Sequence, residues 1–415
     1  MKMNRRLFLK KTAAGWLLST GSLAFADYTK TKYSPNENAI IYLFLSGGPS
    51  HIETFNPIPL AAVERRSVTG VAQTNVAGMQ LGGLFKELGK RGDRLSVFRG
   101  FGHRDANHAS ATHWLMTGEP GFANNGQKWP SYGSVVSGHY GTNVESNGMP
   151  TYVKVNPIQH DDASWMGSKY MGYDANAEGR DDLKLKVELE RFARRKEIVS
   201  SIEQNSVIKG QLFAREWTDL REQAINVITG QASKAFKIEE DREYQNYKDN
   251  RLGTDMLTAI RLIESGCKFV TLNYGGWDMH NNIKTGLESR QTVLDSYLGK
   301  LMDSIKERGL YDNVMLVITG EFGRTPKINA NAGRDHWAGL CPLAISCGAY
   351  EMGRVVGDSD EYATEAIDGK CGPEDLRYTV FSHLGIDKNS MWLSIEGRPM
   401  HLNKESSKNI LTELS

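Results

Sequence analysis

The stretch AIIYLFLSGG, residues 39–48, joins seven apolar residues directly to a serine and two glycines. A short apolar run that contains β-branched residues and ends in a turn is typical of a buried strand. The glycines indicate a tight turn at the carboxyl end of that strand, with free backbone amides able to hold an anion. Ligands bind at this end of the strands in open α/β sheets, so the stretch predicts a buried strand with polar site residues after it.

Further runs of the same kind follow along the chain, and the clearest are Leu95–Arg99, Tyr152–Val155, Lys268–Asn273, Val314–Thr319 and Leu343–Ser346. Apolar positions recur at helical spacing over Thr254–Ser265 and Leu287–Arg308, each directly before one of these runs. Alternation of strand and helix is typical of a mostly parallel sheet that helices cover on both faces. We therefore predict an α/β fold in a single domain over residues 27–415.

Three segments depart from this alternation. Asp182–Asp249 is rich in Lys, Glu, Arg and Gln, contains no Pro, and includes amphipathic stretches such as Leu183–Ile202 and Gln211–Val227. We expect it to form a helical insertion on the flank of the sheet, with its charges on a solvated helix face rather than in a binding site. Asn56–Gly83 and Gly348–Gly372 are rich in loop residues, and the second is able to form a short hairpin.

Composition and charge exclude several classes of protein. A chain of 415 residues that is 40% hydrophobic and 24% charged has enough apolar material for a core, which excludes a disordered or collagen-like chain. The net charge of +1 hides an asymmetry, because residues 1–26 contribute five basic groups and no acidic group, leaving 45 basic against 49 acidic residues in the remainder. That slightly acidic body has no electrostatic surface for nucleic acid or an anionic membrane, so we expect neither partner.

The first 26 residues have the pattern of a twin-arginine export signal. The adjacent pair Arg5-Arg6 is followed by Leu, Phe and Leu, then by a mildly apolar stretch over 12–23 and the small-residue site Ala24-Phe25-Ala26. The alternative is a buried amphipathic first helix, which is disfavoured because all the charge lies on one side of a stretch too short to span a membrane. We predict cleavage after Ala26 and a periplasmic or secreted mature protein without membrane insertion.

Four cysteines lie in the C-terminal third, at Cys267, Cys341, Cys347 and Cys371, without zinc-finger spacing. We interpret them as buried thiols, and leave open a bridge between Cys341 and Cys347.

Polar side chains, and histidines above all, follow the predicted strands. Six of the ten histidines lie in these segments: His51, His103, His108, His113, His280 and His336. Asp278 and His280 are two residues apart, so in extended backbone both project to one face, as metal ligands would. A carboxylate and an imidazole suit Zn²⁺, Mn²⁺ or Fe better than Ca²⁺, although a hydrogen-bonded loop pair is the alternative. Arg104, Arg324 and Arg334 are candidates to grip an anionic substrate, or to pair with neighbouring acids.

Several motifs carry a resemblance to a known family. The arginine signal, LFLSGGPSHIETFNP, HRDANHASATH, GGWDMHNN, GEFGRTP and GRDHW together resemble the bacterial exported family known as domain of unknown function 1501. The stretches 297–319 and 373–387 are similar to late elements of sulfatases and their alkaline-phosphatase-like relatives. The resemblance covers nearly the whole chain and implies a three-layer α/β/α fold of the alkaline-phosphatase-like type.

The resemblance also implies site residues, with departures. Ser46-Gly47-Gly48 stands where such enzymes usually place a metal-binding Asp, and Phe322 replaces a usual histidine, so one of two metal positions is in doubt. Asp278, His280 and His336 remain as ligands of a divalent metal, with zinc as the candidate and Glu321 as a fourth ligand. Ser50 with His51 is the candidate nucleophile pair, because the formylglycine motif of sulfatases is absent. Arg104, His108 and Arg324 are assigned to substrate binding.

These observations predict an exported metal-dependent hydrolase of a phosphate or sulfate ester, carried on a small molecule or a polymer. The alternative is a non-catalytic periplasmic or cell-surface binding protein on the same fold.

Overall fold

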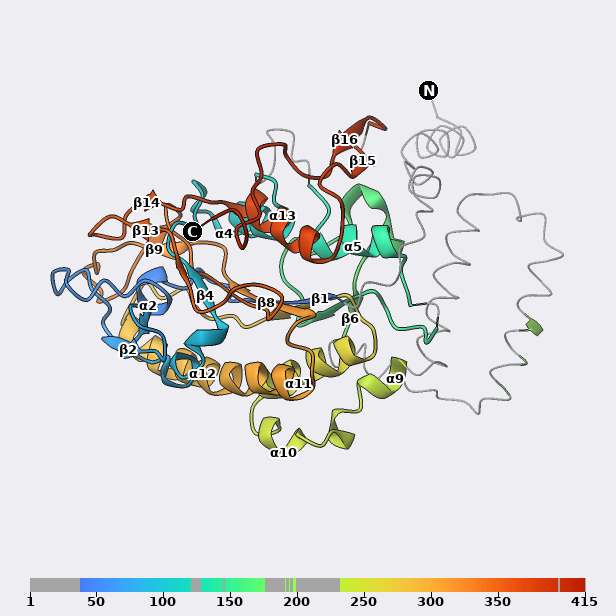
Figure 1. Cartoon of the computed structure of the whole chain (residues 1–415), viewed down its shortest axis with the longest axis horizontal. Helices are drawn as coiled ribbons and strands as arrows, with labels where there is room; N and C mark the ends of the chain where they lie inside the picture. The colour runs from blue at the N-terminus through green and yellow to red at the C-terminus, as the bar shows by residue number, and fades with distance from the viewer. Residues whose placement is uncertain are drawn as a thin grey trace, which may run out of the picture.

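The centre of the molecule is an eight-stranded sheet, seen nearly edge-on in Figure 1. The computed structural model describes residues 38–120, 128–144, 146–175, 191, 194, 197–198, 232–394 and 396–414. The strand order is β12-β4-β11-β8-β1-β7-β5-β6. In chain order these strands are β1 (Ala39–Phe44), β4 (Ser96–Phe98), β5 (Tyr152–Val155), β6 (Tyr173–Asp174), β7 (Phe269–Asn273), β8 (Val314–Thr319), β11 (Leu343–Ser346) and β12 (Val355–Val356).

The sheet is mostly parallel, as the sequence predicts. β1 pairs in parallel with β7 on one side and β8 on the other, and Phe44 lies opposite both Asn273 and Thr319. These three strands therefore end level, which brings the loops that follow them to one edge of the sheet. The exception is β11, which pairs antiparallel with both β8 and β4. All six predicted apolar runs form strands of this sheet.

Helices cover both faces of the sheet, which confirms the predicted three-layer arrangement. In Figure 1, α11 (Arg251–Glu264) and α12 (Ile283–Glu307) lie below the sheet, and α4 (His108–Thr117), α5 (Tyr132–Tyr140) and α13 (Pro373–His383) lie above it. Side chains alternate along β1, so Ile41 and Leu43 pack in the cluster with α11 and α12, whereas Tyr42 and Phe44 pack in the cluster with the helices of the other face. A central strand buried on both faces explains the unbroken apolar run.

Local signals fix where α4 begins and ends. The Asn107 side chain accepts hydrogen bonds from the backbone N–H groups of Ala109 and Ser110, which caps the helix, and Gly118 ends it with a φ of 71°. The cap sets His108 as the first residue of the helix, facing the edge of the sheet where the parallel strands end.

Smaller elements complete the described chain. Residues 56–83 contain the hairpin β2 (Val71–Gln73) and β3 (Gln80–Gly82), and residues 348–372 form the predicted hairpin, β13 (Asp358–Ser359) and β14 (Ala366–Asp368). Two further pairs are β9 (Gly323–Arg324) with β10 (His336–Trp337) and β15 (Met391–Leu393) with β16 (Pro399–His401). The short helices are α2 (His51–Thr54), α3 (Lys86–Gly89), α9 (Ala232–Ala235) and α10 (Tyr244–Tyr247).

Two predicted segments lie wholly or largely outside the described residues. The export signal over 1–26 is one of them. Of the predicted insertion over 182–249, the structure describes residues 232–249, which carry α9 and α10, and four single positions before them. All four cysteines are free and buried, so Cys341 and Cys347 form no bridge. Within the ranges given above, no helix has the length and apolar character needed to cross a membrane.

Candidate metal centre

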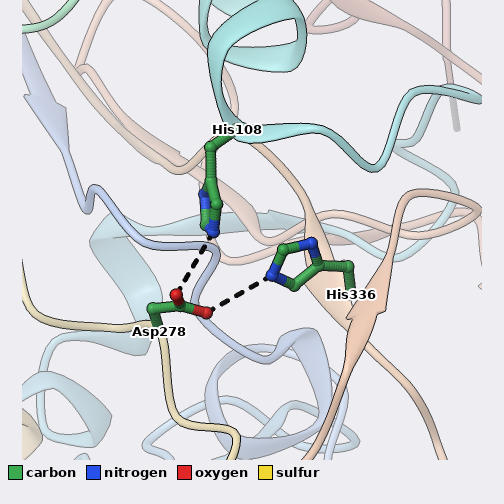
Figure 2. A group of neighbouring side chains, drawn as sticks. All are labelled: His108, Asp278 and His336. Atoms are coloured by element: carbon green, nitrogen blue, oxygen red, sulfur yellow. Dashed lines mark hydrogen bonds and ion pairs between the residues drawn. The ribbon is translucent and has the colours of Figure 1, made fainter.

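His108, Asp278 and His336 converge beyond the carboxyl ends of the parallel strands, and Figure 2 shows both imidazoles pointing at the carboxylate. His108 comes from the first turn of α4, Asp278 from the loop after β7, and His336 from β10. One ligand atom of each lies within 4.8 Å of those of the other two. His108 Nε2 is 3.4 Å from Asp278 Oδ2, and His336 Nε2 is 3.3 Å from Asp278 Oδ1.

His280 adds a third imidazole to this group. Its Nε2 atom lies 3.0 Å from Asp278 Oδ1 and 3.0 Å from His336 Nε2. The three histidines and Asp278 are called the Asp278 cluster below. The sequence predicts three of the four as metal ligands, and places His108 in substrate binding instead.

The outer nitrogen of every ring in the Asp278 cluster is held by an oxygen acceptor. His108 Nδ1 lies 2.6 Å from Glu321 Oε1, His280 Nδ1 lies 2.7 Å from Asp335 Oδ1, and His336 Nδ1 lies 2.8 Å from the carbonyl oxygen of Ala106. Because a carbonyl or carboxylate oxygen only accepts, each Nδ1 carries the proton and donates it. Each Nε2 therefore turns a lone pair towards Asp278 in the neutral ring, which is the usual support for histidine ligands of a metal.

The charge of Asp278 is fixed by its neighbours. Partial burial by itself raises the pKa of this carboxyl, but the hydrogen bond and charge of Arg324 outweigh it and lower the pKa to about 2. Asp278 is therefore ionised at neutral pH. The hydrogen bond from His108 to Glu321 raises the pKa of His108, whereas burial lowers the pKa of His336. Asp278 is 47% exposed, so the cluster is open to solvent.

The Asp278 cluster fits a divalent cation. Three imidazole nitrogens and one carboxylate are a donor set that suits Zn²⁺. His280 Nε2 and His336 Nε2 lie 3.0 Å apart. When both rings are neutral with the proton on Nδ1, their lone pairs face each other, and a shared cation, or a proton on one Nε2, removes the repulsion. His108 Nε2 is also buried without a hydrogen-bond donor, as a nitrogen reserved for a cation would be.

Glu321 lies behind His108 rather than beside the other ligands. It is 2% exposed, and its Oε1 accepts from His108 Nδ1 and, at 2.8 Å, from the backbone N–H of Gly47. The glycine turn after β1 thus holds an anion, as predicted, but the anion is this carboxylate of the protein itself. The resemblance gives Glu321 as a fourth metal ligand, whereas the contacts of its Oε1 are with His108 and the Gly47 backbone.

Ser50 and His51 have local contacts that differ from those of a nucleophile pair. Ser50 caps α2, where its hydroxyl accepts from the backbone N–H of Glu53 at 3.4 Å. His51 is 2% exposed, its Nε2 donates to the carbonyl oxygen of Ala363 at 3.0 Å, and burial lowers its pKa to about 4. Within the described residues, no hydrogen bond or ion pair joins either side chain to the Asp278 cluster. Their predicted catalytic role gains no support from these contacts.

The three candidate arginines have different surroundings. Arg324 is fully buried, and its Nη2 donates to Asp278 Oδ1 at 2.6 Å. Arg334 is also fully buried, where it pairs with Glu53 at 2.9 Å and donates to backbone carbonyls. Neither has a guanidinium free to meet a ligand, so their use is internal. Arg104 is exposed and forms no hydrogen bond or ion pair with another described residue.

Arg104 lines a pocket of about 480 Å³ between the end of β4 and the start of α13. Trp114, Lys370 and Glu374 are among the other lining residues, as is His103, whose Nε2 donates to the carbonyl oxygen of Glu321 at 2.7 Å. The pocket is thus linked to the segment that carries Glu321, although none of the four residues of the Asp278 cluster lines it.

Several solved structures are similar to this chain at low identity. They include a phosphonate monoester hydrolase from Silicibacter pomeroyi, at 10% identity and a TM-score of 0.41 over 87% of this chain and 75% of that one. A sulfatase from Pseudoalteromonas sp. matches at 12% identity and a TM-score of 0.42, over 84% of this chain and 68% of that one. Lipoteichoic acid synthase from Listeria monocytogenes matches at 13% identity and a TM-score of 0.36, over 96% and 81%. All three TM-scores are below 0.5, so these likenesses assign no activity to the chain.

None of the curated proteins matches the sequence. The family model described as "Protein of unknown function (DUF1501)" matches residues 37–414, a range that contains the whole Asp278 cluster. The chain therefore belongs to the DUF1501 family, as its motifs predicted.

Proposed function

We propose that this protein is an exported, metal-dependent hydrolase of a phosphate or sulfate ester. The observation that carries the proposal is the convergence of three Nε2 atoms on Asp278, with every Nδ1 already held by an acceptor. A bound divalent ion, with zinc as the candidate, supplies positive charge that polarises the ester and stabilises the leaving oxygen.

Some residues of the chain would bind that ion directly, and others orient the residues that bind it. His108, His280, His336 and Asp278 are its ligands, and Glu321 and Asp335 fix the rings of His108 and His280. Arg324 keeps Asp278 ionised and in place through the 2.6 Å contact. Arg104 and Lys370 give the adjoining pocket two cations for a negatively charged substrate.

Export belongs to the proposal as well. The Arg5-Arg6 pair and the Ala24-Phe25-Ala26 site support translocation by the twin-arginine route with Asp27 as the mature terminus. Replacement of both arginines by lysine should leave the precursor in the cytoplasm. Unchanged export, or another mature terminus, would contradict this part.

The hydrolase is tested on mature protein purified without chelator, by elemental analysis and by hydrolysis of p-nitrophenyl phosphate, bis-p-nitrophenyl phosphate and p-nitrophenyl sulfate. We expect bound metal and turnover of at least one ester in wild type, and loss of both in Asp278→Ala and His280→Ala. The exposed residues Asp368 and His401 supply matched controls, since Asp368→Ala and His401→Ala should behave as wild type. A protein that holds no metal, cannot be reloaded and hydrolyses none of the esters would instead support the non-catalytic binding protein.

A further inference from the structure

We infer that the Asp278 cluster binds one divalent ion and not two, because the guanidinium of Arg324 already supplies a second positive charge at the Asp278 carboxylate. The inference rests on the proposed metal-dependent function. It concerns how many ions the site binds and the positive charge that Arg324 adds to it.

The guanidinium of Arg324 is fixed in position on every side. It is fully buried, and its Nε donates to the carbonyl oxygen of Gly48 at 2.7 Å. Nη1 donates to the carbonyl oxygen of Arg334 at 3.1 Å and lies 3.4 Å from His280 Nε2, and Nη2 donates to the carbonyl oxygen of Gly47 and to Asp278 Oδ1. Most of the N–H groups of the guanidinium donate to backbone carbonyl oxygens, which hold it in place. The positive charge of Arg324 is therefore a fixed part of the site.

The Gly47-Gly48 turn is shaped for this guanidinium. Gly48 has a φ of 66°, and a Cβ atom added to it would lie 2.3 Å from the Phe322 ring and 3.4 Å from Arg324 Nε. The left-handed backbone directs the carbonyl oxygens of both glycines at Arg324. The glycines have no side chain that could bind a second ion. The Gly47-Gly48 turn instead presents two carbonyl oxygens, and both accept hydrogen bonds from Arg324.

The carboxylate of Asp278 has no free side for a second ion. A carboxylate that bridges two cations gives one oxygen to each. Here Oδ1 accepts from Arg324 at 2.6 Å and also faces His280 Nε2 at 3.0 Å and His336 Nε2 at 3.3 Å, and Oδ2 faces His108 Nε2 at 3.4 Å. Among the described residues, one group of three or more acidic, imidazole or thiol side chains has ligand atoms all within 4.8 Å of one another, and it is His108, Asp278 and His336, with His280 Nε2 beside it at 3.0 Å from Asp278 Oδ1.

The charges around the cluster balance a single divalent ion. The charged side chains in contact with it are the carboxylates Asp278, Glu321 and Asp335 and the guanidinium of Arg324, which sum to −2 when the histidines are neutral. One divalent ion brings this sum to zero. A second ion would leave an excess of two positive charges beside the guanidinium of Arg324, which repels it.

The test is a metal titration of protein stripped with chelator and then dialysed. Stripped wild type and Asp278→Ala are equilibrated with excess Zn²⁺, gel-filtered and analysed for zinc, and the difference between them is the occupancy of the cluster. We expect a difference of one ion per chain. A difference of two would overturn the inference while leaving the proposed hydrolase intact, whereas no difference would overturn the proposed metal centre itself.

Two further measurements test the role of Arg324. Co²⁺ replaces Zn²⁺ in the titration, and we expect a visible absorption that saturates at one equivalent without the magnetic coupling of an ion pair. Arg324→Gln keeps a donor for Asp278 but removes the charge, so we expect the variant to take up a second Zn²⁺ at excess, measured against an Asp278→Ala/Arg324→Gln blank. If the folded Arg324→Gln variant still binds one Zn²⁺ per chain, Arg324 does not determine the number of ions. If the variant does not fold, the number of Zn²⁺ ions bound by wild type relative to Asp278→Ala tests the inference.

Discussion

His280 Nε2 and His336 Nε2 lie 3.0 Å apart, although each ring already donates its Nδ1 proton to another acceptor. Two neutral rings in these tautomers meet lone pair to lone pair, and either a proton on one Nε2 or a cation bound by both removes the repulsion. A divalent ion bound at this position would therefore be held by both rings at once.

Metal removal should therefore lower the thermal stability of wild type. A ligand that binds the folded state at a hundred times its Kd stabilises it by about 3 kcal/mol, so stripping with chelator should lower the Tm by several degrees. Differential scanning calorimetry checks this, with Asp278→Ala as the control whose Tm should not respond to chelator. Equal responses in both proteins would place the metal somewhere other than the Asp278 cluster.

Arg104→Ala should weaken substrate binding and leave the metal in place. The side chain is exposed, lines the 480 Å³ pocket and has no partner among the described residues, so its loss removes a contact to the substrate alone. A charged hydrogen bond is worth about 1.5 kcal/mol, which predicts a KM about tenfold higher with kcat little changed. The matched control is Arg398→Ala, because Arg398 is also exposed and lies directly before β16, outside the residues that line the pocket. An unchanged KM would remove the pocket from the substrate path.

The sequence predicts the strands of the sheet well because each strand can be recognised from a short local pattern of residues. A strand buried on both faces must be apolar throughout, so β1 and β8 stand out as unbroken runs bounded by turns. The antiparallel course of β11 escapes this reasoning. A short strand buried on both faces has the same composition in either direction, so its antiparallel pairing with β8 and β4 leaves no local signal.

The candidate site is harder to predict, because its assignments depend on where side chains point across distant loops. The spacing of Asp278 and His280 on one loop predicts that they lie together. Nothing in the segment around His108 shows that the start of α4 reaches Asp278, 170 positions later, so the sequence predicts a substrate contact for His108 and not a metal ligand. Glu321 and Arg324 follow the same strand, yet one supports a histidine and the other a carboxylate. The local sequence around Glu321 and Arg324 does not indicate which partner each side chain has.

Acid should destabilise the protein through Asp241, far from the cluster in sequence. Burial by itself raises the pKa of Asp241, but hydrogen bonds from Arg308, the backbone N–H of Glu243 and Arg261 outweigh it and lower the pKa from 3.8 to about 2. A depressed folded-state pKa stabilises the fold above the unfolded value near 4, and this contribution is lost as the pH falls through 2. Its size is on the order of 2 kcal/mol.

Asp241→Asn tests this sign. Urea unfolding of the variant and wild type should differ most at pH 6 to 7, and the difference should shrink steadily between pH 5 and pH 2. A difference that is constant across this range would show that packing, and not the charge of Asp241, accounts for the loss.

Glu53→Gln should be among the most destabilising single changes in the described chain. Glu53 and Arg334 are both fully buried, and the carboxylate also accepts from Ser67 Oγ and the Val68 backbone N–H. Removal of one charge leaves Arg334 buried without its counter-ion, which typically costs about 3–5 kcal/mol. Chemical unfolding at pH 7 measures the loss, and a value below about 1 kcal/mol would show that the carbonyl partners of Arg334 suffice.

Glu321→Gln should weaken metal binding without removing a ligand. The carboxylate fixes the proton of His108 on Nδ1 and leaves Nε2 free for the ion, and a glutamine amide can present either a donor or an acceptor to that ring. Loss of such a supporting carboxylate typically lowers metal affinity about 10–100-fold. Competition with a chelator of known affinity measures the change, and the exposed Glu365→Gln serves as the control because Glu365 lies outside the Asp278 cluster. An affinity equal to that of wild type would reduce Glu321 to a packing role. Loss of all metal, as in Asp278→Ala, would show instead that Glu321 itself contacts the ion.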